Sequence, residues 1–337
     1  MFKPQYRITD HCLSLIRKIT ELTTRIGQTN VAFSQMARLQ REAINRNVHA
    51  STSIEGNILS LVQVSALSEN RDVDADVLQK REVSNYLEAL RWVVKKGRLR
   101  ITEKKLLHLH AMIVKGLVPD KKAGSYKNRP NYVIDEKKVV VYRPPSSKKC
   151  PGLLQELTVW VNKKSNIHPV ILSGVFHHQF VSIHPFSDGN GRLARAASQW
   201  ILYHKQFDPQ HILSLDDFYS EDRKRYYEKI QQARDLDYDL THWIEYVAEG
   251  VCETVEKVYS RIKKLSLSSG KKIVVTPRQE ELVELLNMKG TLSSSDISRF
   301  LKINRARVNQ LISPLVKARI VNKEGKARAT RYFLNEL

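Results

Sequence analysis

The sequence HPFSDGNGRLAR, residues 184–195, places an imidazole, a carboxylate, a glycine-flanked turn and two arginines within twelve positions. Pro185 disfavours helical geometry for the residue before it, so His184 is expected on an extended or turn backbone. The two glycines allow the chain to turn tightly and to approach a ligand closely. The residues from Arg192 onward favour a helix, whose free N–H groups would face the glycine loop. A glycine loop before a helix N-terminus predicts an anion-binding site.

The other side chains of this stretch suit phosphate chemistry. Arg192 and Arg195 are three positions apart, so they project from one side of the first helical turn. Asp188 is a hard oxygen ligand suited to magnesium on a polyphosphate, and His184 is suited to accepting a proton near neutral pH. We therefore predict a phosphate-transfer site with a histidine base. The alternative is a glycine-rich loop that caps a structural helix, with Asp188 as an ordinary turn residue.

The stretch also resembles the signature of the Fic family, HPFx[DE]GNGRxxR, at every specified position. The resemblance implies transfer of AMP from ATP to the hydroxyl group of a Ser, Thr or Tyr in a target protein. It implies that His184 is the catalytic base, that Asp188 binds Mg²⁺, and that Arg195 holds the γ-phosphate. The nucleotide-binding residues that it implies in the loop are Gly189, Asn190, Gly191 and Arg192.

A second informative segment ends an expected helix at about residues 34–57. Gly56 is placed as a left-handed residue at the helix end, and Glu55 falls in the last turn, where the helix dipole disfavours a carboxylate. The segment resembles the family's inhibitory motif, [ST]xxxE[GN], with Ser51, Glu55 and Gly56 at the specified positions. This resemblance implies that Glu55 pairs with Arg195 and blocks productive ATP binding. The alternative is an exposed glutamate at a frayed helix end.

Further resemblances concern the nucleotide base and the target peptide. Positions similar to Gln199, Tyr226 and Tyr227 lie near the adenine in the family, but tyrosines in amphipathic helices are usually half-buried packing residues. Two β-rich runs within residues 125–145 predict a hairpin. Its position before the signature resembles that of the family's flap, which covers the nucleotide and aligns the target. The alternative is a plain surface hairpin.

With 337 residues, the chain is long enough for about two domains. We expect a mainly α-helical fold with a helical region at 1–100 and a Fic core at 101–260, followed by a linker at 261–272. Near the N-terminus, apolar residues three positions apart predict a helix. These residues are Leu13, Ile16, Ile19 and Leu22.

The last part, residues 273–337, resembles a winged helix, an α+β domain. Thr276 and Gln279 form a capping box with a proline at the first helical position, which opens a helix to about residue 288. Two more helices are expected at 295–301 and 305–317. Residues 320–324 and 328–334 then form the expected two-stranded wing.

Positive charge is concentrated in this part of the chain. Residues 261–337 contain 17 Lys and Arg against 6 Asp and Glu, a net charge of +11 out of +21 for the whole chain. Such a surface favours polyanions, with nucleic acid as the first candidate. The start of the third helix of a winged helix contacts DNA, which predicts that role for Arg305, Arg307, Asn309 and Gln310. The alternatives are a solubility surface and a module for protein contact or dimerisation.

Composition indicates a cytoplasmic protein without a membrane partner. The sequence is 42% hydrophobic, enough for a real core. No apolar run approaches the roughly 18 residues of a membrane span, and the N-terminus lacks the apolar segment of a secretory signal. Three cysteines, odd in number and far apart, indicate free thiols in a reducing compartment.

Three hypotheses of function follow from these features. The first is an autoinhibited protein AMP-transferase with ATP as its substrate and Mg²⁺ as its cofactor. The second is a DNA-binding regulator whose Fic core senses nucleotide, although an intact His184 favours catalysis because a sensor needs no base. The third is transfer of another nucleotide, or removal of AMP with Glu55 aligning a water. The target protein stays unknown, and self-modification and a homodimer stay open.

Overall fold

The computed structural model describes residues 2–134, 139–163, 166–268, 276–318, 320–325 and 330–335. Helices dominate this part of the chain, together with two small antiparallel sheets. One large hydrophobic core lies among the helices up to Ile262, and a second, smaller core lies in the C-terminal part. Within the described ranges, every helix is too short or too polar to cross a membrane.

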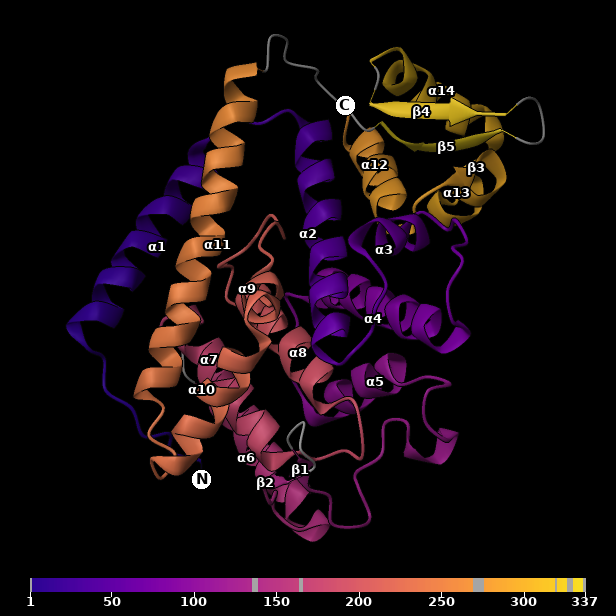
Figure 1. The fold of residues 1–337 in the computed structure, drawn as a ribbon. Coiled ribbons are helices and arrows are strands. Elements are labelled where there is room, and N and C mark those ends of the chain that lie inside the picture. The colour runs from indigo at the N-terminus through magenta and orange to yellow at the C-terminus, as the bar shows by residue number, and fades with distance from the viewer. Residues whose placement is uncertain are drawn as a thin grey trace.

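Helix α1 (Asp10–Gln28) runs beside the long helix α11 (Thr241–Ser268) at one edge of the molecule (Figure 1). The buried face of α1 repeats every seven residues, at Cys12, Ile19 and Ile26. The predicted helix is present, and Leu13 lies outside its buried face, being 59% exposed. The reason is that α1 packs mainly on one helix and buries a narrow seam rather than a wide stripe.

Helix α2 (Phe33–Ile54) packs against α3 (Leu61–Ser68), α4 (Val77–Lys96) and α9 (Leu215–Glu221). The sequence predicted this helix at about 34–57. The helix starts one residue earlier than predicted and ends three residues earlier, so that Glu55 is the C-cap residue. Gly56 follows with a φ of 100°, in the region that favours glycine after a helix end.

Helices α7 (Pro169–Ile183) and α8 (Asn190–His204) form the centre of the large core. Nearly every residue of α7 is buried, which explains why its sequence is apolar all round. Helix α8 begins two residues before Arg192, where the sequence predicted its start. The surrounding helices are α5 (Glu103–Ile113), α6 (Cys150–Lys163) and α10 (Arg223–Asp235), with short 3₁₀ turns at Asp120–Lys122 and Ser147–Lys149.

The predicted hairpin is present next to this helix pair. Strands β1 (Val133–Ile134) and β2 (Val140–Tyr142) pair in antiparallel register, with Val133 opposite Tyr142. The residues between them, 135–138, lie outside the described part of the chain. Tyr142 donates a hydrogen bond of 2.9 Å to the Ser182 carbonyl, so the hairpin is attached to the end of α7.

The start of the linker, expected at residue 261, was predicted too early. Helix α11 continues to Ser268, and residues 269–272 lie outside the described part. The helix continues because its apolar seam does: Ile262 is fully buried, and Leu265 packs against the same core. Lys263 and Lys264 are exposed on the outer face of this helix, which the sequence predicted to end too soon.

The C-terminal part has its own small core. Three helices form it, α12 (Pro277–Lys289), α13 (Ser294–Leu301) and α14 (Arg305–Lys317), and the predicted Thr276–Gln279 capping box opens α12. Strands β4 (Val321–Glu324) and β5 (Arg331–Leu334) pair with each other, and β5 also pairs with β3 (Leu292–Ser293), which the sequence analysis missed. The elements follow the order that a winged helix needs, and that assignment stays a prediction.

This part packs on the N-terminal half of α2, as the neighbouring positions of α12, α2 and α3 in Figure 1 show. Ala37 of α2 is buried in the C-terminal core. The Asn287 side chain donates a hydrogen bond of 3.3 Å to the Gln40 side chain, and Asn70 donates to the Lys289 carbonyl. One helix therefore contacts both cores.

Candidate active site

His184 ends helix α7 in a left-handed conformation, with φ 47° and ψ 59°. The backbone before Pro185 is therefore a turn and not a right-handed helix, as expected. The His184 amide still donates to the Phe180 carbonyl at 3.0 Å, and the left-handed residue then directs the chain out of the helix. The helix thus stops at the residue whose imidazole was predicted to be the base.

The His184 ring has a defined orientation. Its Nδ1 lies 3.3 Å from the Val181 carbonyl oxygen. Because a carbonyl can only accept, this contact places the proton on Nδ1 and leaves Nε2 as an acceptor. Burial lowers the pKa of His184 to about 4, so the ring is neutral at physiological pH.

The loop after His184 is held by its own side chains. Asn190 accepts from the Phe186 amide at 3.0 Å and donates to the Phe186 carbonyl at 2.9 Å. The Phe186 ring is fully buried and stacks on His110, with 3.8 Å between ring centroids. His110 Nε2 in turn lies 3.0 Å from the Asp188 carbonyl. The Asn190 side chain, predicted to bind nucleotide, thus fixes the shape of the loop.

Gly189 has to be glycine in this loop. Its φ is 76°, and a Cβ there would lie 2.7 Å from Val114 Cγ1. Helix α8 begins at the next residue, so the amides of residues 190–192 are those that a helix leaves without intrahelical partners. Free amides at a helix start suit an anion, so the geometry is compatible with the binding site that the sequence predicts.

Asp188, in the loop before α8, lies against Arg192 of the first turn of this helix. Arg192 Nη2 is 3.3 Å from both carboxylate oxygens of Asp188. The Asp188 side chain is 53% exposed, so it is open to a ligand from solvent. The Arg192 side chain is only 5% exposed, and its Nη1 lies 2.7 Å from Glu82 Oε1 of α4.

The structure brings the predicted inhibitory residues onto Arg195. Arg195 Nη2 donates to Glu55 Oε1 at 2.7 Å and to the Ser51 carbonyl at 2.9 Å, and Nε donates to Ser51 Oγ at 2.7 Å. The Arg195 side chain is completely buried. The Glu55 carboxylate also lies against Gly191, where a Cβ would collide with it. The end of α2 therefore lies against the first two turns of α8.

The three residues predicted to lie near the adenine differ in their burial and in their partners. Tyr226 is buried beneath Arg195, with its hydroxyl 3.5 Å from Nη1 and 2.8 Å from His177 Nε2. Tyr227 is 40% exposed beside it. The Gln199 amide donates to the Leu213 carbonyl at 3.1 Å, which ties it to the chain after α8.

The segment that leads into the hairpin contacts the signature loop directly. The Asn131 side chain donates to the Phe186 carbonyl at 2.9 Å, and the Lys127 amide donates to the Pro185 carbonyl at 2.9 Å. Apolar side chains on the hairpin are exposed, among them Tyr132 at 50% and Ile134 at 56%. An exposed strand edge next to the loop suits an extended segment of another chain.

Three neighbours of the site were given no role from the sequence. His110 supports Phe186, Glu82 pairs with Arg192, and Asn57 donates to Glu82 Oε2 at 2.8 Å. Each lies on a different element from the residue that it supports. The fold had to be known before they could be assigned.

The residues predicted to contact DNA lie far along the chain, on α14. All four are exposed, and Asn304 caps the helix by accepting from the Arg307 amide at 2.8 Å. Arg307 Nη1 donates to Gln310 at 3.0 Å, and Arg305 donates to the Ser295 hydroxyl at 2.7 Å. With Asn309, they form a polar surface at the start of the helix.

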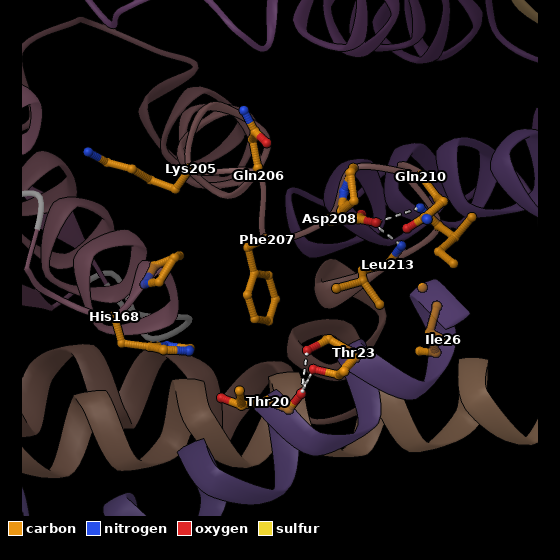
Figure 2. A pocket seen from close by; sticks show the side chains of 15 residues that line it. Thr20, Thr23, Ile26, His168, Lys205, Gln206, Phe207, Asp208, Gln210 and Leu213 are labelled. Atoms are coloured by element: carbon orange, nitrogen blue, oxygen red, sulfur yellow. Dashed lines mark hydrogen bonds between the residues drawn. The ribbon is translucent and has the colours of Figure 1, made fainter. Parts of the chain in front are cut away.

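A separate cavity of about 360 Å³ lies between α1 and residues 205–213 (Figure 2). Thr20, Phe207 and His168 line it, and none of its lining residues belongs to the signature or to the segment from Ser51 to Gly56. Asp208 accepts from the amides of Ile212 and Leu213 at 3.1 Å each. The cavity therefore lies apart from the phosphate chemistry.

Comparisons with known proteins all point to the same family. A family model described as the Fic/DOC family matches residues 100–202. Proteins named protein adenylyltransferase Fic from Nematostella vectensis and Aedes aegypti are each 27% identical to this chain, over 72% and 68% of its length. The alignments cover 55% and 44% of those proteins, so this chain spans about half the length of these curated relatives.

Solved structures resemble the chain over different lengths. A Fic family protein from Desulfovibrio desulfuricans G20 is 26% identical with a TM-score of 0.67, and the match covers 100% of this chain and 99% of that one. Fic-1 from C. elegans shares the fold with a TM-score of 0.64 at 24% identity, over 75% of this chain and 73% of that one. The signature loop, its helix pair and the family match together show that residues 100–202 of this chain form a Fic domain of the Fic/DOC family.

Proposed function

We propose that this protein transfers AMP from ATP to the hydroxyl group of a Ser, Thr or Tyr in a target protein. The geometry of His184 carries the proposal: a neutral ring with Nε2 as acceptor stands directly before a helix start that suits phosphates. His184 takes the hydroxyl proton while the oxygen attacks the α-phosphorus. The new O–P bond forms as the bond to pyrophosphate breaks, and pyrophosphate leaves. The names of the curated relatives support this reaction.

Asp188 fits the role of a magnesium ligand. It is half-exposed at the loop, and the described ranges hold no cluster of three or more His, Cys, Asp or Glu that would form a complete metal site. Magnesium in such enzymes is typically held by one or two carboxylates together with substrate phosphates. Bound there, the ion would neutralise charge on the phosphates. The loop amides and Arg192 would stabilise the charge that develops during transfer.

We also propose that Glu55 inhibits the reaction. Its carboxylate occupies the guanidinium of Arg195 and lies against Gly191, in the space that we assign to the nucleotide phosphates. Because Arg195 is completely buried, its few donor groups cannot serve the carboxylate and a γ-phosphate at once. Activation then requires Glu55 to leave Arg195.

Labelling with α-³²P-ATP and Mg²⁺ tests both proposals in one experiment. Wild type, Glu55→Gly and Glu55→Gly/His184→Ala are compared for label on themselves and on proteins of a cell extract. We expect label from Glu55→Gly alone, because that variant has a base and no carboxylate on Arg195. Equal labelling by wild type and Glu55→Gly under saturating MgATP would refute the inhibition.

An absence of label with all three variants, although ATP still binds, would refute AMP transfer from ATP. Other nucleotides and an AMP-modified protein are then offered, to detect a different donor or the removal of AMP. If these also fail, the Fic domain senses nucleotide for a regulator. The exposed basic residues at the start of α14 support such a role, and we propose that residues 276–335 bind DNA as a winged helix.

A further inference from the structure

Arg192 is a buried cation that depends on carboxylate partners. Its side chain is 5% exposed, and removing the partner of a buried charge is strongly destabilising. Two carboxylates reach it. Asp188 lies 3.3 Å from Nη2 and is 53% exposed, whereas Glu82 lies 2.7 Å from Nη1 and is 16% exposed. Glu82 is thus the closer and the better buried of the two.

The second oxygen of Glu82 holds the segment that follows the inhibitory helix. Asn57, two residues after Glu55, donates from Nδ2 to Glu82 Oε2 at 2.8 Å and to the Gln79 carbonyl at 3.1 Å. Its Oδ1 accepts from the Leu59 amide at 3.1 Å, and the residue is buried. One carboxylate of α4 therefore connects the signature helix with the end of the inhibitory segment.

We infer that Glu82 is a positioning residue, which holds the Arg192 guanidinium at the helix start where the nucleotide phosphates bind. The inference rests on the proposed function of the loop. Glu82 lies outside the part of the chain that matches the family, and the signature does not include it. Its role is to orient Arg192 and not to contact the reacting atoms.

We expect the carboxylates of Asp188 and Glu82 to change partners differently when nucleotide binds. Asp188, in the loop just before the helix that carries Arg192, is the residue that we assign to magnesium. Once it turns to the ion, Glu82 is the partner that keeps Arg192 in place. If Glu82 loses its charge, Arg192 is left with Asp188 alone of these two, and their i, i+4 pair competes with both the ion and the phosphates. Loss of Glu82 should therefore weaken binding of the nucleotide with and without the metal.

The test uses the full chain in the Glu55→Gly background, so that the Glu55 carboxylate is absent throughout. Glu82→Gln keeps the shape of the side chain and an oxygen for Asn57, but it removes the charge that pairs with Arg192. Glu88→Gln is the matched control, because it makes the same change at an exposed position of the same helix. ATP affinity is measured by calorimetry in EDTA and in Mg²⁺, and KM and kcat of AMP transfer are measured separately.

We expect Glu82→Gln to weaken ATP binding about 10- to 100-fold in both conditions, the range found when a residue that orients a ligating group is removed. The Mg²⁺ concentration for half-maximal binding should rise, and KM should change more than kcat. Glu88→Gln should stay within about twofold of its parent. Equal ATP affinity of Glu82→Gln and Glu88→Gln would overturn the inference.

A second variant tests the inference in case Glu82→Gln does not fold. If Glu82→Gln does not fold, as judged by thermal unfolding, Glu82→Asp decides, since it keeps the charge on a side chain one methylene shorter. A folded Glu82→Asp with weakened ATP binding supports positioning, and one that binds ATP normally and has an unchanged KM overturns it. If the Glu55→Gly parent binds ATP but transfers no AMP, the proposed function fails, while the affinity comparison still decides the role of Glu82.

Discussion

The state of one imidazole sets the pH range in which the site can work. Val181 orients the His184 ring, and burial lowers the pKa of His184 to about 4, below the 6.5 of an unperturbed histidine. A base acts in its unprotonated form, so we expect the proposed reaction to be lost only when the pH falls through this lowered value. At neutral pH nearly every molecule carries the neutral ring.

We therefore expect kcat/KM for AMP transfer by Glu55→Gly to be flat from about pH 5.5 to 8 and to fall near pH 4, since this ratio reports the free enzyme. Initial rates at subsaturating MgATP across this range measure it. Far-ultraviolet circular dichroism at each pH serves as the control for acid unfolding. An acid limb near pH 6.5 would contradict the assigned environment of His184.

Other residues of the site show which contacts could be predicted from the sequence and which could not. Ser51 and Glu55 could be connected to Arg195 because both motifs are local strings with a known resemblance, and the structure brings them within 2.9 Å of its guanidinium. Glu82 could not be found in this way. A glutamate on an amphipathic helix is usually a solvated residue, and only the packing of α4 against α8 makes it the partner of Arg192.

Among the elements, boundaries were predicted best where the sequence contains a chemical stop signal. Helix α12 opens at the predicted capping box of Thr276 and Gln279, and α14 begins at the predicted residue because Asn304 caps it. Strand β3 was missed because its two residues, Leu292 and Ser293, cannot display an alternating pattern. The end of α11 was placed too early because polar residues on its outer face resemble a linker.

The continuation of α11 can be tested by its stability. Ile262 is fully buried within the part that the sequence assigned to a linker. Ile262→Asp should lower the free energy of unfolding by about 3 kcal/mol or more, because it removes core packing and buries a charge. Lys263→Asp, at the exposed neighbouring position, should change it by less than about 1 kcal/mol. Urea unfolding followed by circular dichroism compares them, and equal stability of the two variants would mean that this segment is not packed.

At the scale of the whole molecule, α2 connects the two cores. Its N-terminal half contributes Ala37 to the C-terminal core, and its C-terminal end leads to Glu55 on Arg195. The C-terminal part is therefore not attached only through the chain after α11. It also rests on the helix that we propose to control the reaction.

The charge of this C-terminal part leads to a prediction for the full-length chain. Residues 261–337 carry a net charge of +11, and α14 exposes Arg305 and Arg307 at its start. We expect the protein to bind duplex DNA with an affinity that falls steeply with salt, because bound phosphates release counterions. Arg305→Ala/Arg307→Ala should weaken binding and reduce the slope of log K against log salt by about 2, roughly one for each phosphate that the variant no longer neutralises.

Fluorescence anisotropy with a labelled duplex at several salt concentrations measures this slope. Lys148→Ala/Lys149→Ala is the matched control, because it removes the same charge from an exposed part of the Fic core. If both double variants reduce the slope equally, DNA is attracted by the total charge of the molecule and α14 is not a specific surface. If no binding occurs even at low salt, the basic surface of α14 serves a protein partner, and the positive charge of the chain needs another explanation. Only a weakening confined to the α14 variant supports the assignment of Arg305 and Arg307 to DNA.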